Sequence, residues 1–285
     1  MKVLISVDME GTTGVSSWIH VTAQEEAGGG PANQSEYERA RLRMTREVNA
    51  AIEGALAGGA EEVIVNDSHD GQRNLIAEEL HRECRFISGN DKPLGMMQGV
   101  DLDGIGAVFY TGYHAKAGTP GGPLAHTWTT WLNDIRFDGR STGEFGLNAV
   151  IAGHFGVPVV LVTGDEKAVA QTQEILGNQV VGVPVKTGIS TTAAIHLHPA
   201  KAQDLICEGA KQAMKNVGGA RPFTIPEMAT VELEFDHQAR ADQAALLECA
   251  SRVGERTIAF EAGTGLQFCR RFRTAMKLAG VRMNP

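Results

Sequence analysis

Short apolar runs, each followed by polar side chains, dominate the first two thirds of the chain. They cover residues 2–7, 62–66, 106–110 and 157–163 and are rich in Val and Ile. Continuous apolar runs of this length are typical of strands buried on both faces of a parallel sheet. The pattern therefore predicts four strands of this kind.

Segments with apolar residues at helical spacing separate these strands. Residues 35–55 form the strongest of them, and a capping box at residues 35–38 (SEYE) predicts where the helix begins. Residues 142–153 and 165–176 predict two further helices. Alternating strands and helices predict an α/β fold, with a mostly parallel sheet and helices on both faces.

The pattern changes after residue 180. A short β-like run is followed by a helix, two strands and a closing amphipathic helix, over residues 180–185, 199–217, 229–235, 257–262 and 266–279. This mixture predicts a smaller α+β C-terminal part. We therefore expect an α/β domain of residues 1–185 that carries the functional site, and an α+β subdomain of residues 186–285.

Composition and charge exclude several classes of protein. The 285 residues, 42% hydrophobic and 21% charged, are typical of a globular protein with a large core. A net charge of −8 without runs of Lys and Arg argues against nucleic-acid binding. We expect no membrane association, because no apolar stretch approaches the roughly 20 residues of a membrane span. Four cysteines without a CxxC pair, and no signal-peptide region, predict a cytoplasmic protein with reduced thiols.

Metal-binding side chains follow three of the predicted strands. Asp8 and Glu10 follow the first, His69 the second and His114 the third. The carboxyl ends of parallel strands meet at one edge of a sheet, where ligands bind. Each residue alone could be an ordinary polar strand end, but three coincident strand ends favour a shared site. Glu144, in the first turn of a helix, is favoured there by the helix dipole and could also bind a metal.

These five residues form a carboxylate–imidazole set without thiolates. They exceed the needs of one tetrahedral zinc ion and suit two divalent ions about 3.5–4 Å apart, with a bridging carboxylate and a water whose pKa falls toward about 7. His126, in a segment rich in Gly and Pro, could transfer a proton or stabilise an oxyanion. The residues predict a binuclear metallohydrolase but do not distinguish amide, ester and phosphate bonds.

The motifs around these residues resemble those of the zinc-dependent D-aminopeptidases encoded in dipeptide-transport operons (DppA-like). The resembling segments lie in order between residues 3 and 175, and together they are specific although each alone is weak. They are Ser6-Val-Asp-Met-Glu-Gly11, Val65-Asn-Asp-Ser-His69, Ile87-Ser-Gly with Lys92-Pro93, Gly112-Tyr-His114-Ala, Gly143-Glu-Phe-Gly-Leu-Asn-Ala149, and Val157-Pro-Val with Gly164-Asp165.

The resemblance implies a binuclear zinc aminopeptidase that hydrolyses short peptides with N-terminal D-amino acids, D-alanine above all. It implies two Zn²⁺ ions per subunit, with Co²⁺ or Mn²⁺ as substitutes, and a homodecamer of two stacked pentameric rings. The family's catalytic histidine corresponds to His126, although on chemical grounds we expect metal-bound hydroxide to be the nucleophile. The family's metal ligands correspond to Asp8, which would bridge the ions, and to Glu10, His69, His114 and Glu144.

Two alternatives stay open at this level. One is a binuclear hydrolase of an L-peptide, another amide or a phosphoester, for which Lys116 or Arg73 could bind a phosphate. The other is a non-catalytic peptide-binding protein with a structural metal, although structural zinc sites are usually rich in thiolates.

The group that binds the substrate amine is also open, with four candidates: Glu10, Asp67, Asp70 and Asp165. Residues 21–33 look like an insertion relative to the family.

Overall fold

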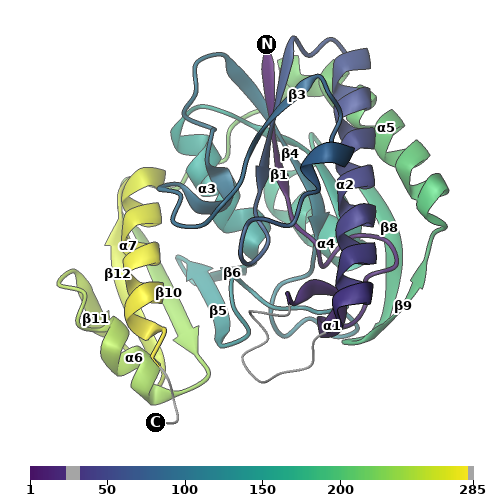
Figure 1. Cartoon of the computed structure of the whole chain (residues 1–285). Helices are drawn as coiled ribbons and strands as arrows, with labels where there is room; N and C mark the ends of the chain where they lie inside the picture. The colour runs from purple at the N-terminus through teal and green to yellow at the C-terminus, as the bar shows by residue number, and fades with distance from the viewer. Residues whose placement is uncertain (24–32, 282–285) are drawn as a thin grey trace.

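A seven-stranded sheet forms the centre of the molecule (Figure 1). The computed structural model describes residues 1–23 and 33–281. The strand order is β3-β2-β1-β4-β7-β8-β9, and every neighbouring pair is parallel except β8 and β9. The expected mostly parallel sheet is therefore confirmed. Its strands are β1 (Lys2–Val7), β2 (Glu62–Asp67), β3 (Cys84–Ile87), β4 (Ile105–Tyr113), β7 (Val159–Asp165), β8 (Val181–Ser190) and β9 (Ala193–His196).

Helices cover both faces of this sheet, as expected. Successive strand residues point to opposite faces, so in β1 Val3 and Ile5 join one apolar cluster while Leu4 joins another. The first cluster includes residues of α2 and α5, and the second includes residues of α3 and α4. Figure 1 shows α2 and α5 side by side on one flank. These helices are α2 (Gln34–Ala57), α3 (Glu144–His154), α4 (Glu166–Leu176) and α5 (Pro199–Asn216).

A second, antiparallel sheet lies beside α3 and α7 (Figure 1). Its order is β11-β12-β10-β5-β6. The apolar stripe of the closing helix, which includes Cys269, Phe272 and Met276, belongs to the same cluster as Leu147 of α3, so it packs inside the chain. These elements are β5 (Leu132–Phe137), β6 (Arg140–Thr142), β10 (Ala229–Phe235), α6 (Gln238–Ala244), β11 (Ala250–Arg252), β12 (Thr257–Ala262) and α7 (Gly265–Ala279).

The two sheets divide the chain differently from the expected boundary. Residue 185 lies within β8, a strand of the first sheet. The second sheet takes β5 and β6 from the first half of the chain and β10 to β12 from the second half. The division into residues 1–185 and 186–285 stays a prediction.

The predicted start of the first long helix was wrong by two residues. Asn33 is the N-cap, and its side-chain oxygen accepts the N–H of Glu36 at 3.2 Å. Asn33 thus occupies the capping position that the sequence pattern assigned to Ser35, because an Asn side chain can cap equally well. Short elements that no periodicity announced are α1 (Trp18–Val21), β3, β9, β11 and the 3₁₀ turns Ala77–Glu79, Gly95–Met97 and Val217–Gly219.

Residues 24–32, most of the expected insertion, lie outside the described residues. Over residues 1–23 and 33–281, no helix has both the length and the apolar character needed to cross a membrane.

Candidate metal centre

The site lies at the point where the strand order reverses: β2 and β3 are added on one side of β1, and β4 and β7 on the other. β1 has β2 on one side and β4 on the other, and Val7 is in register with both Asp67 and Thr111. The carboxyl ends of these three strands therefore lie at the same level. A reversal of this kind leaves a crevice beyond the strand ends, where ligands bind in open α/β sheets.

A glycine lets the ends of β1 and β4 approach each other closely. The N–H of Asp8 donates to the carbonyl of Thr111 at 2.8 Å, and the N–H of Gly11 donates to the carbonyl of Gly112 at 2.7 Å. Gly112 has φ +69°, and a Cβ there would lie 2.2 Å from the Asp8 carbonyl oxygen. No side chain fits in that space, so the glycine allows β4 to bring His114 to Asp8.

Asp8, Glu10 and His69 form the first group of candidate ligands. The Nδ1 atom of His69 lies 3.4 Å from Asp8 Oδ1 and 3.1 Å from Glu10 Oε2. The other ring nitrogen, Nε2, lies 2.7 Å from the carbonyl oxygen of Val21, which can only accept. The Nε2–H group therefore donates to this carbonyl, which leaves Nδ1 as the ring nitrogen that faces the carboxylates and can bind a metal.

His114 and Glu144 form a second group on the other side of Asp8. His114 Nε2 lies 3.4 Å from Asp8 Oδ2 and 3.2 Å from Glu144 Oε1. The Nδ1 atom of His114 lies 3.0 Å from the carbonyl oxygen of Ala115, so Nδ1 donates and Nε2 is free to bind a metal. The two carboxylate oxygens of Asp8 thus face different histidines.

His126 lies against the second group. Its ring stacks on His114 with centroids 4.0 Å apart, and its Nε2 lies 3.7 Å from Glu144 Oε1 and 3.9 Å from Glu10 Oε1. Nδ1 donates to the carbonyl of Leu124 at 2.8 Å. Burial, together with the neighbouring His114, lowers the pKa of His126.

Backbone strain accompanies this placement of His126. Leu124 and Trp128, two residues to either side, have φ +52° and φ +64°, values that non-glycine residues rarely adopt. The N–H of Trp128 donates to Glu144 Oε1 at 2.7 Å and so links the loop to the second group. Strain of this kind persists where surrounding contacts hold it, often at functional sites.

Negative charge is concentrated in the cluster. Burial, together with the Glu10 carboxylate, raises the pKa of Asp8 to about 7. Burial opposes protonation of His114, but Glu144 and Asp8 raise its pKa to about 10. Burial likewise opposes protonation of His69, yet Glu10 and Asp8 hold its pKa well above the ordinary value. Three buried carboxylates this close together favour positive charge between them.

Unpaired polar atoms test whether metal ions suit these residues. Among the described residues, Asp8 Oδ2, Glu10 Oε2 and His114 Nε2 are buried and have no hydrogen-bond partner. Each lies within 3.4 Å of another candidate ligand. Buried polar atoms are rarely left unpaired, and oxygen and imidazole donors suit divalent zinc. The residues therefore fit a bound metal.

A cavity of about 580 Å³ opens over the cluster. Trp18, Trp128 and Trp131 contribute to its wall, and the described cations that line it are Lys92 and Arg273. Lys116 and Arg73, which the sequence suggested as phosphate ligands, are not among its described lining residues. Sequence reasoning noticed Lys92 only within a family motif, and it missed Arg273 because nothing in the pattern of the closing helix indicates which site it faces.

Hydrogen bonds and exposure distinguish three of the candidate carboxylates for the substrate amine. Asp67 accepts hydrogen bonds from the backbone N–H groups of Asn74 and Leu75 at 2.5 and 2.7 Å. Asp165 caps α4 and accepts the N–H of Ala115 at 3.0 Å. Both carboxylates therefore already accept hydrogen bonds from the backbone, whereas Asp70 is exposed and lines the cavity.

Comparisons with known proteins agree with each other. The sequence model of peptidase family M55, described as D-aminopeptidase, matches residues 1–274. A D-aminopeptidase of Bacillus subtilis (strain 168) is 38% identical over 263 residues, covering 92% of this chain and 92% of that protein. The solved structure of the Zn-dependent D-aminopeptidase DppA from Bacillus subtilis, a self-compartmentalizing protease, matches with a TM-score of 0.91 and 35% identity over 100% of both chains.

Proposed function

The chain belongs to the M55 family of D-aminopeptidases and is a peptide hydrolase, and from this premise we propose that it is a binuclear zinc enzyme. Its substrates are short peptides with an N-terminal D-amino acid, D-alanine preferred. The observation that carries the proposal is the position of Asp8, whose two carboxylate oxygens face two separate histidine–carboxylate groups.

In this proposal Asp8, Glu10 and His69 would hold one ion, and Asp8, His114 and Glu144 would hold the other. Zinc, when bound, supplies Lewis acidity and lowers the pKa of a coordinated water toward about 7. The backbone carbonyls that accept from His69 and His114 hold each ring with one nitrogen toward the cluster. Such outer contacts fix ligand orientation before substrate arrives.

His126 transfers the proton in this proposal. Because its Nδ1 donates to the Leu124 carbonyl, its Nε2 is the unprotonated nitrogen and faces the cluster. Nε2 can accept the proton of the attacking water and then deliver it to the leaving amine. The strained backbone around His126 keeps the ring at this position.

The cavity and the relatives suggest the substrate size and the assembly. A volume of about 580 Å³ accommodates a short peptide, and three tryptophans among the lining residues add apolar surface. The DppA relative is a self-compartmentalizing protease. We therefore propose that this chain also forms a homo-oligomer, a decamer of two pentameric rings.

Release of D-alanine from D-Ala-D-Ala, compared with L-Ala-L-Ala, tests the function. Each assay is run on the purified protein, after chelation, and after zinc reloading, with bound zinc measured by mass spectrometry. We expect two zinc ions per chain, and turnover of the D-peptide that chelation abolishes and zinc restores. Turnover of neither peptide by fully zinc-loaded protein would refute the proposed activity.

A further inference from the structure

Side chains of both charges line the cavity. The metal centre contributes the carboxylates of Asp8, Glu10 and Glu144, whereas Lys92 and Arg273 contribute positive charge, and Asp70 and Asp91 also line the cavity. The proposed ligands account for the first set. The fold and the proposed function leave the two cations without an assigned role.

Lys92 places its ammonium at the end of β2. Its Nζ donates to the side-chain oxygen of Asn66 at 2.7 Å and to the carbonyl oxygen of Asp67 at 2.6 Å. Both acceptors are neutral, and an ammonium group has three protons. Among the described residues, no carboxylate lies within salt-bridge distance of Lys92. Burial lowers the pKa of its ammonium to about 8, and the more distant Asp67 carboxylate opposes this shift only in part.

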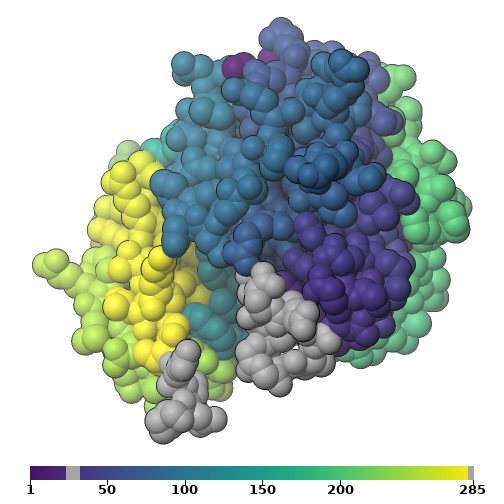
Figure 2. All heavy atoms as spheres, in the orientation of Figure 1, coloured from purple at the N-terminus to yellow at the C-terminus, as the bar shows by residue number. Residues whose placement is uncertain are grey.

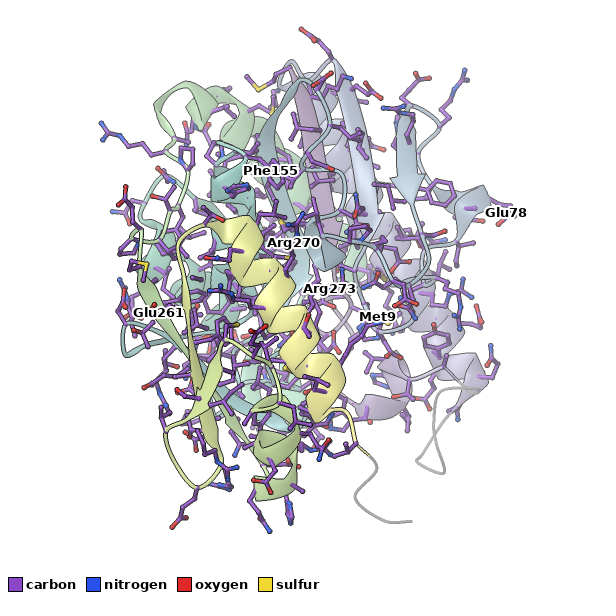
Figure 3. All side chains as sticks on the ribbon, turned by 90° about the vertical axis from the view of Figure 1, so that its left-hand side faces the viewer. Met9, Glu78, Phe155, Glu261, Arg270 and Arg273 are labelled. Carbon is purple, nitrogen blue, oxygen red and sulfur yellow. The ribbon has the colours of Figure 1, made fainter. Side chains whose placement is uncertain are left out.

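Arg273, on α7, contacts the segment that carries Lys92. One Nη1 proton goes to the backbone carbonyl of Lys92, and the described residues supply no carboxylate within salt-bridge distance of its guanidinium. A guanidinium has five N–H donors in a planar fork that matches a carboxylate. Figure 3 labels Arg273 on the side of α7 nearest the strands of the first sheet. Several donors therefore remain for a ligand.

The contact between α7 and the segment that holds Lys92 keeps the two cations together. Lys277 of α7 pairs with Asp91 at 2.8 Å, and the thiol of Cys269 lies 3.8 Å from the Pro93 carbonyl oxygen. In the space-filling view, the yellow C-terminal helix lies against the blue segments that precede β4 (Figure 2). Asp91 thus forms its salt bridge with Lys277 and not with Lys92 or Arg273.

The Lys92 ammonium is held by the strand next to the one that leads to the metal centre. Its acceptor Asp67, at the end of β2, is in register with Val7 of β1, one residue before Asp8, and neighbouring strands lie about 4.8 Å apart. A dipeptide extends about 7 Å. A peptide whose amino end is at the metal centre would therefore place its carboxylate near the two cations after two or three residues.

We propose that Arg273, with Lys92 beside it, binds the C-terminal carboxylate of the substrate and thereby selects di- and tripeptides. The inference rests on the proposed aminopeptidase function and deepens it. It makes Arg273 a specificity-determining residue contributed by α7 to a centre built on the first sheet.

Turnover of D-Ala-D-Ala and of its C-terminal amide tests this inference, because the two share every atom at the scissile bond. We expect zinc-loaded wild type to prefer the acid about tenfold to hundredfold in kcat/KM, the usual effect of a hydrogen bond to a charged group. Arg273→Gln should lose that preference, mostly through a higher KM for the acid. Arg270→Gln, the same change at an exposed position of α7, should behave like wild type.

Two results would overturn the role of Arg273. One is equal turnover of acid and amide by wild type. The other is an equal loss on both substrates in Arg273→Gln with unchanged zinc content, which would assign Arg273 to holding the Lys92 segment.

Calorimetric binding of both peptides to zinc-loaded His126→Ala separates this inference from the proposed function. We expect tighter binding of the acid, and equal affinity would refute the carboxylate site. This comparison tests the carboxylate site even if wild type cleaves neither peptide, a result that would refute only the aminopeptidase activity, and the same comparison with Arg273→Gln added to His126→Ala assigns the site to Arg273.

Discussion

At the scale of single residues, each candidate histidine is oriented by a backbone carbonyl. His69, His114 and His126 donate one ring N–H to Val21, Ala115 and Leu124 respectively. The tautomer of each ring is therefore set by the fold, and the other nitrogen faces the carboxylates. His69 turns Nδ1 and His114 turns Nε2 to the cluster, because their other ring nitrogens face the carbonyls of Val21 and Ala115.

Replacement of the two proposed ligand histidines should remove zinc without unfolding the protein. His69→Ala and His114→Ala should each lose at least one of two zinc ions and lower turnover below detection, because a ligand at 3.4 Å or less from Asp8 is lost. Metal analysis and circular dichroism measure both effects. His154→Ala, at the exposed end of α3, is the control. Full zinc content in both ligand variants would contradict the assignment.

Replacement of His126 should separate catalysis from metal binding. His126→Ala should keep its zinc and lower kcat by about 10²- to 10⁴-fold, the usual contribution of a proton-transfer group. Metal analysis and steady-state kinetics on D-Ala-D-Ala are the measurements. Loss of zinc in this variant would instead make His126 a metal ligand.

At the scale of elements, the site depends on how closely the strand ends pack. The segment after β1 is held from β8, where Lys186 donates from its Nζ to the backbone carbonyls of Glu10, Thr12 and Val15. From the other side, Gly112 of β4 contacts the Asp8 carbonyl. The positions of Asp8 and Glu10 therefore depend on strands that are far away in the sequence.

A matched pair of glycine substitutions tests this close packing. Gly112 and Gly118 both have positive φ, at +69° and +75°, but a Cβ at Gly118 meets nothing within 4 Å. Gly118→Ala should cost only the backbone strain, about 1 kcal/mol. Gly112→Ala should cost several times more and weaken zinc binding, because it displaces Asp8. Urea unfolding and zinc titration measure both, and equal effects of the two substitutions would contradict the argument.

At the scale of the whole molecule, one continuous apolar cluster joins the two sheets. It runs from Leu4 of β1 through Leu147 of α3 to Phe260 of β12 and Phe272 of α7. This shared core positions α7, and with it Arg273, over the cavity of the first sheet. α7, which packs with the second sheet, thus contributes Arg273 to the cavity lining, although it carries none of the proposed metal ligands.

The proposed assembly predicts the mass of the particle in solution. Ten copies of a 30.4 kDa chain should sediment as one species of about 300 kDa. Analytical ultracentrifugation over a range of concentrations measures this mass. A stable monomer at micromolar concentration would contradict the decamer.

The sequence by itself determined the strand ends and the residues they carry. Apolar runs end at Asp8 and before His69, because buried parallel strands need continuous apolar side chains whereas ligand-binding residues follow them. The strands β10 and β12 were predicted with their observed limits, Ala229–Phe235 and Thr257–Ala262. Such local signals require no knowledge of distant contacts.

Only the tertiary structure decided which strands are neighbours, which ring nitrogens face the cluster and which cations line the cavity. Strand order depends on long-range pairing, and β5 pairs with β10, about a hundred residues away in the sequence. The orientation of His69 depends on the carbonyl of Val21, and Arg273 reaches Lys92 only after α7 has packed. These contacts join residues that are far apart in sequence, so no periodicity records them.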